Sequence, residues 1–341
     1  MIHHLGLDNT DESTIVENLK PYTKGDYVVG SCVHEANDWD QIYERQFEPF
    51  IRICNQKGLK YDIITNDTYF DKPFRIPNYT PIVINFFALN TVYRIKNDNV
   101  VTNNKWNANA KKFLFLTGKA DKINRVGLLA ELLNQKLKKK MVWSFFPGVG
   151  TDIYSRSLPY FSKFSTQGYR EFCEKYERSP DNVVAKYSNN GTHYSGFPFD
   201  VDLYKNTAFS VIAESEFQDE TCVWQTEKTF KAIVNKHPFI MASQLGSIER
   251  LKEQGFKTFE NYLAYPDYYK IKNPEKRILV IAKNSRHWIK NLNNIEEIEK
   301  DVEHNYKRLF ELFDETIAKH EVFKDKLFYN NFFSETSIKN A

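Results

Sequence analysis

Long apolar runs are missing from this chain of 341 residues, and so are the cysteine patterns of zinc sites and disulfide frameworks. No run approaches the roughly 18 apolar residues that span a bilayer. The opening residues, Met1–His4, carry neither the basic region nor the apolar core of a secretion signal. The four cysteines show no CxxC spacing. These absences predict a cytoplasmic protein with no membrane span, structural zinc or disulfide.

Glycine and proline are also scarce, at 13 and 12 residues, which excludes collagen-like and low-complexity classes. Hydrophobic residues make up 41% of the chain and aromatic residues 15%, a composition typical of globular proteins. At this length we expect two domains. The net charge of +3 is too small to indicate a nucleic-acid-binding protein by itself. We interpret the basic cluster at residues 136–140 as the end of a helix, where cations complement the helix dipole.

The apolar pattern predicts an α/β fold built from two Rossmann-like domains. Alternating strands and helices favour a parallel sheet in each domain. The domains are predicted at residues 1–105 and 106–293, with a long amphipathic helix and tail at 294–341. In the first domain, strands are predicted at 27–32, 60–65 and 81–87, and a helix at 38–54. In the second, strands are predicted at 112–117, 141–144, 209–213 and 237–242, and helices at 124–139, 226–235 and 247–254, the last closed by Gly255.

Thr226, Glu227 and Lys228 open a predicted helix directly after a strand that ends at Glu214 and a polar loop. Ligands of open α/β sheets bind at such strand ends. A helix N-terminus offers free N–H groups and partial positive charge to a phosphate, Lys228 adds a full charge, and Glu227 can accept hydrogen bonds from ribose hydroxyls. The group suits a nucleoside diphosphate. The alternative is an ordinary helix that Thr226 caps. In that case Glu227 only interacts favourably with the helix dipole, and Lys228 is solvated.

These blocks, together with the strand Pro238–Ile240, resemble the donor-binding region of the α1,3-fucosyltransferase family. The resemblance implies a GT-B fold, in which two Rossmann-like domains face a cleft, and a glycosyltransferase activity. It implies that Glu227 binds the donor ribose and Lys228 the pyrophosphate. Arg125, at the head of the helix after the first strand of the second domain, takes the place of an arginine that clamps the donor phosphates. The other donor-binding candidates are Lys119, Glu214 and Thr226.

Phage-encoded relatives of this family are similar over roughly residues 112–286. The blocks that carry this likeness are Pro198–Asp200, Tyr204, His237–Ile240, Gly246–Ser247 and Gly255–Phe259. The chain departs from fucosyltransferases at Trp224–Gln225 and in the strand Pro238–Ile240, where they have Pro-Val-Val, so the donor remains a UDP- or a GDP-sugar. One acceptor is a hydroxylated cytosine in double-stranded phage DNA, exposed by base flipping, and the location is then the host cytoplasm. The alternatives are a surface or capsule saccharide, or a catalytically inactive module that binds sugar nucleotides.

Inverting transfer needs a general base for the acceptor hydroxyl. Glu35 and Asp38 follow the first predicted strand, on the edge where the loops of a parallel sheet bind ligands, and Glu35 is the first candidate. The alternative is that both are solvated loop residues and that Asp38 is a helix N-cap. We discount the Asp-x-Asp triplets at 38–40 and 200–202 as metal ligands, because Arg125, Lys228 and a helix dipole already neutralise a leaving diphosphate. The predicted reaction therefore uses a sugar-nucleotide co-substrate and no metal or other cofactor.

Overall fold

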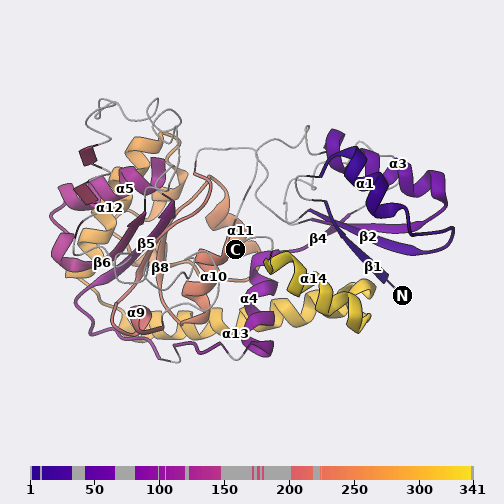
Figure 1. Cartoon of the computed structure of the whole chain (residues 1–341). Helices are drawn as coiled ribbons and strands as arrows, with labels where there is room; N and C mark the ends of the chain where they lie inside the picture. Colours follow the sequence, from indigo (N-terminus) through magenta and orange to yellow (C-terminus); the bar gives the residue numbers. More distant parts are fainter. Residues whose placement is uncertain are drawn as a thin grey trace. The chain divides into compact units, whose positions relative to one another are not determined.

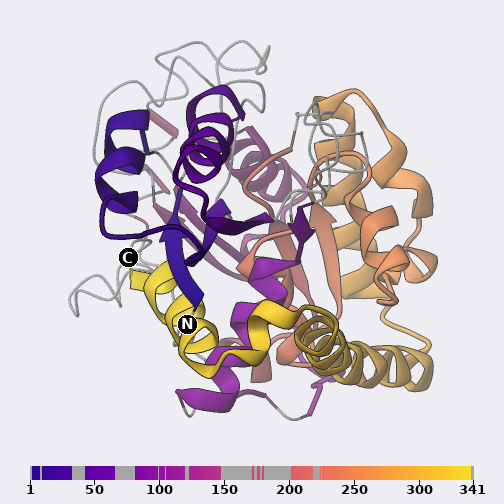
Figure 2. The same cartoon turned by 90° about the vertical axis from the view of Figure 1, so that its right-hand side faces the viewer.

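The computed structural model describes residues 2–7, 10–32, 43–65, 81–98, 100–103, 105–119, 123–146, 171–172, 175–176, 179, 201–217, 223 and 225–338. Over these residues the chain is an α/β protein with two four-stranded sheets, and every described strand pair is parallel. The chain divides into two compact units, Met1–Tyr93 with Glu311–Ala341 and Arg94–Phe310. Figures 1 and 2 show both units coloured along the sequence.

The sheet of the first unit has the strand order β1-β2-β3-β4. Its strands are β1 (Ile2–Gly6), β2 (Tyr27–Cys32), β3 (Lys60–Thr65) and β4 (Ile82–Val83). The predictions of β2 and β3 are confirmed. The strand predicted at 81–87 is wrong in its second half, because a helix begins at Phe86. Sequence reasoning missed β1, whose five residues include two histidines and a glycine and form no apolar run.

Helices α1 (Glu12–Leu19) and α3 (Glu48–Lys57) supply apolar side chains to the core of this unit, and a short π-helix, η1 (Tyr43–Phe47), leads into α3. The packing is close at Gly30 of β2. A Cβ atom there would lie 2.8 Å from Leu7 Cδ1 and 3.0 Å from the Phe50 ring, so only glycine fits without a shift. Of the helix predicted at 38–54, residues 38–42 lie outside the described part and 43–54 are helical.

The C-terminal segment belongs to the first unit and completes its core. Figure 2 shows α14 (Lys326–Ile338) beside β1. Phe333 of α14 stacks on Tyr93 of α4 (Phe86–Asn97), with ring centroids 4.9 Å apart. The long helix predicted from residue 294 is present as α13 (Ile295–Lys319), but it ends before His320, and a short 3-10 turn, η8 (Glu321–Lys324), and α14 follow it. The extended backbone of His320 redirects the chain so that Phe323 is buried.

The limits of the two compact units lie inside helices α4 and α13, whereas the sequence-based domains end at residues 105 and 293. The first unit also includes residues 311–341. Aromatic packing accounts for this membership, because rings of the C-terminal segment contact rings of α4 and β1. Among the helices that the structure describes, none is long and apolar enough to cross a membrane.

The sheet of the second unit has the strand order β6-β5-β7-β8, and the prediction of a parallel sheet here is confirmed. Its strands are β5 (Phe113–Lys119), β6 (Met141–Phe146), β7 (Ser210–Ala213) and β8 (Phe239–Ala242). Along the chain, β6 is added on one side of β5 and β7 on the other. The strand order therefore reverses between β5 and β7, which is the switch point where open α/β sheets bind ligands.

Helices α5 (Ile123–Asn134) and α10 (Glu227–Val234) follow the two strands at this switch point. The remaining helical elements of the unit are η3 (Lys138–Lys140), α9 (Val201–Lys205), α11 (Ser247–Glu253), η6 (Phe259–Tyr262), η7 (Pro266–Lys270), α12 (Pro274–Lys290) and the start of α13. The predictions of α10 and α11 are confirmed, and Gly255 closes α11 with a left-handed φ of 89°. The helix predicted at 124–139 ends at Asn134. Sequence reasoning missed α12, which packs against α5 and β8 (Figure 1).

Candidate functional site

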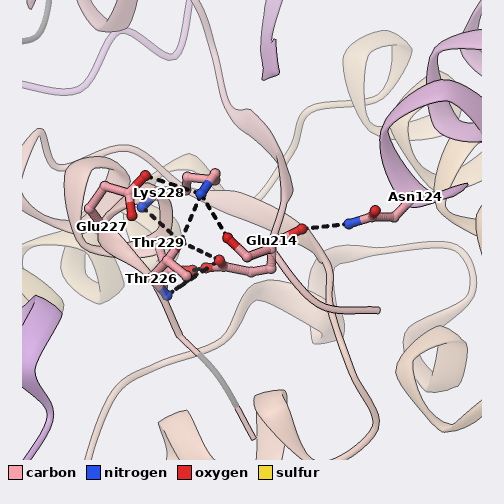
Figure 3. Close-up of polar contacts among 7 residues, drawn as sticks. Asn124, Glu214, Thr226, Glu227, Lys228 and Thr229 are labelled. Carbon is pink, nitrogen blue, oxygen red and sulfur yellow. Dashed lines mark hydrogen bonds and ion pairs between the residues drawn. The ribbon is translucent and has the colours of Figure 1, made fainter. Parts of the chain in front are cut away.

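The start of α5, the helix after β5, is joined to the residue that follows β7 at the carboxyl edge of the second sheet. Asn124, at the start of α5, donates a hydrogen bond from Nδ2 to the main-chain oxygen of Glu214, with a nitrogen–oxygen distance of 2.6 Å (Figure 3). Both residues are fully buried. The Oδ1 atom of Asn124 has no hydrogen-bond partner among the described residues. The beginnings of α5 and α10 are therefore linked at the switch point.

Glu214 directly follows β7, and its side-chain carboxyl group organises the start of α10. It accepts hydrogen bonds from the main-chain N–H of Thr226 at 3.2 and 3.3 Å, and from the hydroxyls of Thr226 and Thr229 at 2.5 Å each. Burial raises the pKa of Glu214, although Lys228 and the two hydroxyls oppose that rise. A fully buried carboxyl group with these partners positions other residues and does not itself reach a ligand.

Thr226 is the N-cap of α10, as predicted. Its backbone is extended, and its side chain accepts from the main-chain N–H of Lys228 at 3.4 Å. A threonine hydroxyl has one proton to donate, and here Glu214 accepts it. The oxygen lone pairs of Thr226 are left to accept from the main chain and from the side chain of Lys228, whose Nζ lies 3.1 Å away.

Glu227 and Lys228 form an ion pair in the first turn of α10, with 3.0 Å between Oε1 and Nζ (Figure 3). Burial would raise the pKa of Glu227, but the positive charges of Lys228 and Lys231 outweigh it and hold the pKa below its usual value. Glu227 is therefore ionised at neutral pH. Its side chain is 18% exposed and that of Lys228 is 24% exposed, so both can meet a ligand.

Lys231 lies one turn beyond Glu227 on α10 and is 7% exposed. Burial lowers the pKa of Lys231, the negative charge of Glu227 opposes that shift, and the positive charge of Lys228 adds to it. A lysine four residues after a glutamate occupies the same face of a helix. Glu227 thus interacts electrostatically with both Lys228 and Lys231, and Lys231 was not identified from the sequence.

Arg125 lies in the first turn of α5, next to Asn124, and is 6% exposed. The first turn of a helix presents main-chain N–H groups without intrahelical partners. The structure therefore places Arg125 at a second helix start, next in the chain to the residue that hydrogen-bonds to Glu214. Lys119 is the last residue of β5, and its side chain lies outside the described part of the structure.

Arg277 of α12 supports the site; the resemblance to the phage-encoded relatives points to this residue but gives it no role. Its guanidinium donates to the main-chain oxygens of Phe217 at 2.5 Å and Ile271 at 3.1 Å, and lies 4.1 Å from the centre of the Phe217 ring. Phe217 belongs to the loop between β7 and α10, two residues beyond Ser215. Arg277 therefore supports the loop that contacts Lys228. In the sequence, an isolated arginine with no predicted helix or strand around it carries no signal of this contact.

The candidate bases Glu35 and Asp38 lie outside the described residues, as does Asp200 of one Asp-x-Asp triplet. Asp202 of that triplet is exposed on α9, 3.6 Å from Lys205. Over the described ranges, no group of three or more His, Cys, Asp or Glu side chains is arranged to hold a metal ion. His237 lies at the opposite edge of the sheet from Glu214. Its two ring nitrogens form hydrogen bonds there with the Ser210 hydroxyl and the main-chain oxygen of Thr207.

Comparison of the chain with protein-family models, with curated proteins and with solved structures finds no match in any of the three. The resemblance of the short sequence blocks to glycosyltransferases therefore stays a prediction. The functional argument rests on the site itself, which joins two helix starts, an ion pair and a buried carboxyl group at the switch point of a parallel sheet.

Proposed function

We propose that the chain is a glycosyltransferase that binds a nucleoside diphosphate sugar at the carboxyl edge of the second sheet and transfers the sugar to an acceptor hydroxyl. The observation that carries the proposal is the Glu227–Lys228 pair at the capped start of α10, at the switch point between β5 and β7. Nucleotides bind open parallel sheets at this position. The short blocks that resemble fucosyltransferases coincide with it.

The chemistry of the residues matches the two ends of a nucleoside diphosphate. Lys228, the N–H groups of α10 and Arg125 offer positive charge to the diphosphate. Glu227 is ionised, so its carboxylate accepts hydrogen bonds from a ribose diol. When the bond between the sugar and the diphosphate breaks, negative charge develops on the leaving oxygen. Cations already held in place stabilise that charge without a metal ion.

Two parallel α/β units in one chain agree with the GT-B arrangement that the resemblance implies. In this proposal the second unit binds the donor, and Glu35 of the first unit is the general base that deprotonates an acceptor hydroxyl. A positioned base typically contributes about 10²- to 10⁴-fold to the rate. Glu35→Gln should thus slow transfer and leave nucleotide affinity unchanged.

The first experiment measures thermal shifts with a panel of UDP- and GDP-sugars, since a ligand of the folded state raises its apparent stability. We expect one nucleotide series to stabilise the wild type and to lose most of its effect with Lys228→Ala. Hydrolysis of the bound donor without acceptor would separate an enzyme from an inactive binding module. Excess chelator should leave that turnover intact. If no nucleotide raises the melting temperature of the wild type, the proposal fails. If chelator abolishes turnover and Mg²⁺ or Mn²⁺ restores it, metal-independent transfer is rejected.

The acceptor is assigned by a product assay with two arms. The enzyme and its donor are incubated with DNA that contains hydroxymethylcytosine, or with a saccharide acceptor, and the nucleosides and glycans are analysed by mass spectrometry. We propose the hydroxylated base as acceptor, so a sugar should be added to the nucleoside. Transfer to the saccharide alone would move the function to surface glycans.

A further inference from the structure

All the hydrogen-bond donors of Lys228 are already used within the protein. A lysine ammonium group has three protons. They face three oxygen atoms: Ser215 Oγ at 3.2 Å, Thr226 Oγ1 at 3.1 Å and Glu227 Oε1 at 3.0 Å. A phosphate can accept a hydrogen bond from this group only if one of these partners gives it up.

The ion pair with Glu227 is the contact that can be released. Thr226 and Ser215 are nearly fully buried, and Thr226 is fixed by its hydrogen bond to Glu214. Glu227 is partly exposed. Glu227 also keeps its electrostatic interaction with Lys231 after Lys228 turns away, because Lys231 lies one turn further along the same face of α10.

We infer that donor binding exchanges the Glu227–Lys228 pair for ligand contacts, and that this exchange makes the site selective for ligands that carry both a diphosphate and a diol. A phosphate alone takes Lys228 from Glu227 and leaves the carboxylate without a replacement donor. A nucleoside alone competes with Lys228 for Glu227. A nucleoside diphosphate supplies an acceptor to Lys228 and donors to Glu227 in the same event. The inference rests on the proposed function and names Glu227 and Lys228 as a coupled pair that determines specificity.

The exchange is tested by titration calorimetry with three probes: inorganic pyrophosphate, a nucleoside, and the nucleoside diphosphate that stabilises the wild type. Glu227→Gln keeps the size of the side chain but removes its charge, so Lys228 is freed. We expect pyrophosphate to bind Glu227→Gln more tightly than it binds the wild type. The ratio of the pyrophosphate Kd to the nucleoside diphosphate Kd should fall on the order of tenfold, which is the size of one charge-assisted contact.

Lys228→Met gives the reciprocal test. Glu227 loses its competing donor, so the nucleoside should bind at least as tightly as to the wild type while pyrophosphate binding is lost. Glu253→Gln is the matched control, because Glu253 forms an exposed pair with Arg250 on the neighbouring helix α11, at 3.1 Å. It makes the same change of charge in the same unit, and all three affinities should stay at wild-type values. Thermal unfolding of each variant verifies that it is folded.

The outcomes separate the inference from the proposed function. If Glu227→Gln weakens pyrophosphate and nucleoside diphosphate binding by the same factor, the pair does not oppose ligand binding and the inference is wrong, although the nucleotide site stands. If no nucleoside diphosphate binds to the wild type, the proposed function itself fails.

Discussion

Two helix starts in this protein follow the same local pattern and differ in their surroundings. In the first unit, Asp11 caps α1 by accepting from the main-chain N–H of Thr14 at 2.8 Å, and Glu12 opens the helix and pairs with Arg52 at 2.8 Å. In the second unit, Thr226 caps α10 and Glu227 opens it. The start of α1 is exposed, with Glu12 at 55% and Arg52 at 39%, whereas that of α10 is largely buried.

The difference shows that a capping residue followed by glutamate does not define a ligand site. The α1 start has no buried carboxyl group from a neighbouring strand beneath it in the described structure. The α10 start has Glu214 under the cap and Asn124 from a second helix beside it. It also follows a strand at a switch point, whereas α1 follows β1 at the edge of a sheet whose described strands run in sequence order. Burial and chain connectivity separate the two.

The largest expected effect is on stability, from Glu214→Ala. Removal of the carboxyl group leaves one main-chain N–H and two hydroxyls without their acceptor in a buried environment. Such a loss costs on the order of 3 kcal/mol in the free energy of unfolding. Asp11→Ala, at the exposed cap, should lower stability far less. Urea denaturation of both variants measures the contrast, and equal losses would show that the buried network adds nothing to an ordinary cap.

A smaller effect is expected on nucleotide affinity, from Arg125→Ala. Loss of a charge-assisted contact to the diphosphate should weaken binding on the order of tenfold. Arg52→Ala is the matched change at the start of α1 and should leave the affinity unaltered. Titration calorimetry of both variants tests this, and wild-type affinity in Arg125→Ala would remove that residue from the proposed site.

The smallest expected effect is a difference in pH dependence. Burial raises the pKa of Glu214 above the ordinary value of 4.5, so its contribution to stability is fully present below that pH and is lost as the pH rises through the folded-state pKa. Hydrogen bonds from Thr14 lower the pKa of Asp11 below 3.8, so its contribution is present above that pH and is lost as the pH falls through the folded-state pKa.

The measurement is urea denaturation of the wild type, Glu214→Gln and Asp11→Asn between about pH 3 and pH 8. The stability advantage of the wild type over Glu214→Gln should grow as the pH falls. Its advantage over Asp11→Asn should shrink at the acid end of the range. Parallel pH profiles for the two pairs would contradict the opposite directions of the two pKa shifts.

Sequence reasoning succeeded where the signal is local and strong. The strands β2, β3, β7 and β8 each contain a short apolar run, and their predicted positions agree with the structure to within a few residues. The cap of α10 and the glycine that closes α11 were also predicted, because each depends on a few adjacent residues. It failed at β1, α12 and the break at His320, where short or mixed patterns give no clear periodicity.

The sequence by itself determined that this protein has two parallel α/β units and that Thr226, Glu227 and Lys228 begin a helix after a strand, since periodicity and capping act over a few neighbouring residues. Only the tertiary structure decided that Glu214 lies under that helix, that Asn124 hydrogen-bonds to Glu214 from 90 residues away, and that the C-terminal segment packs on β1. Those contacts depend on which buried polar and aromatic groups meet when distant segments pack. The local pattern of residues along the chain does not indicate which of these groups will pair.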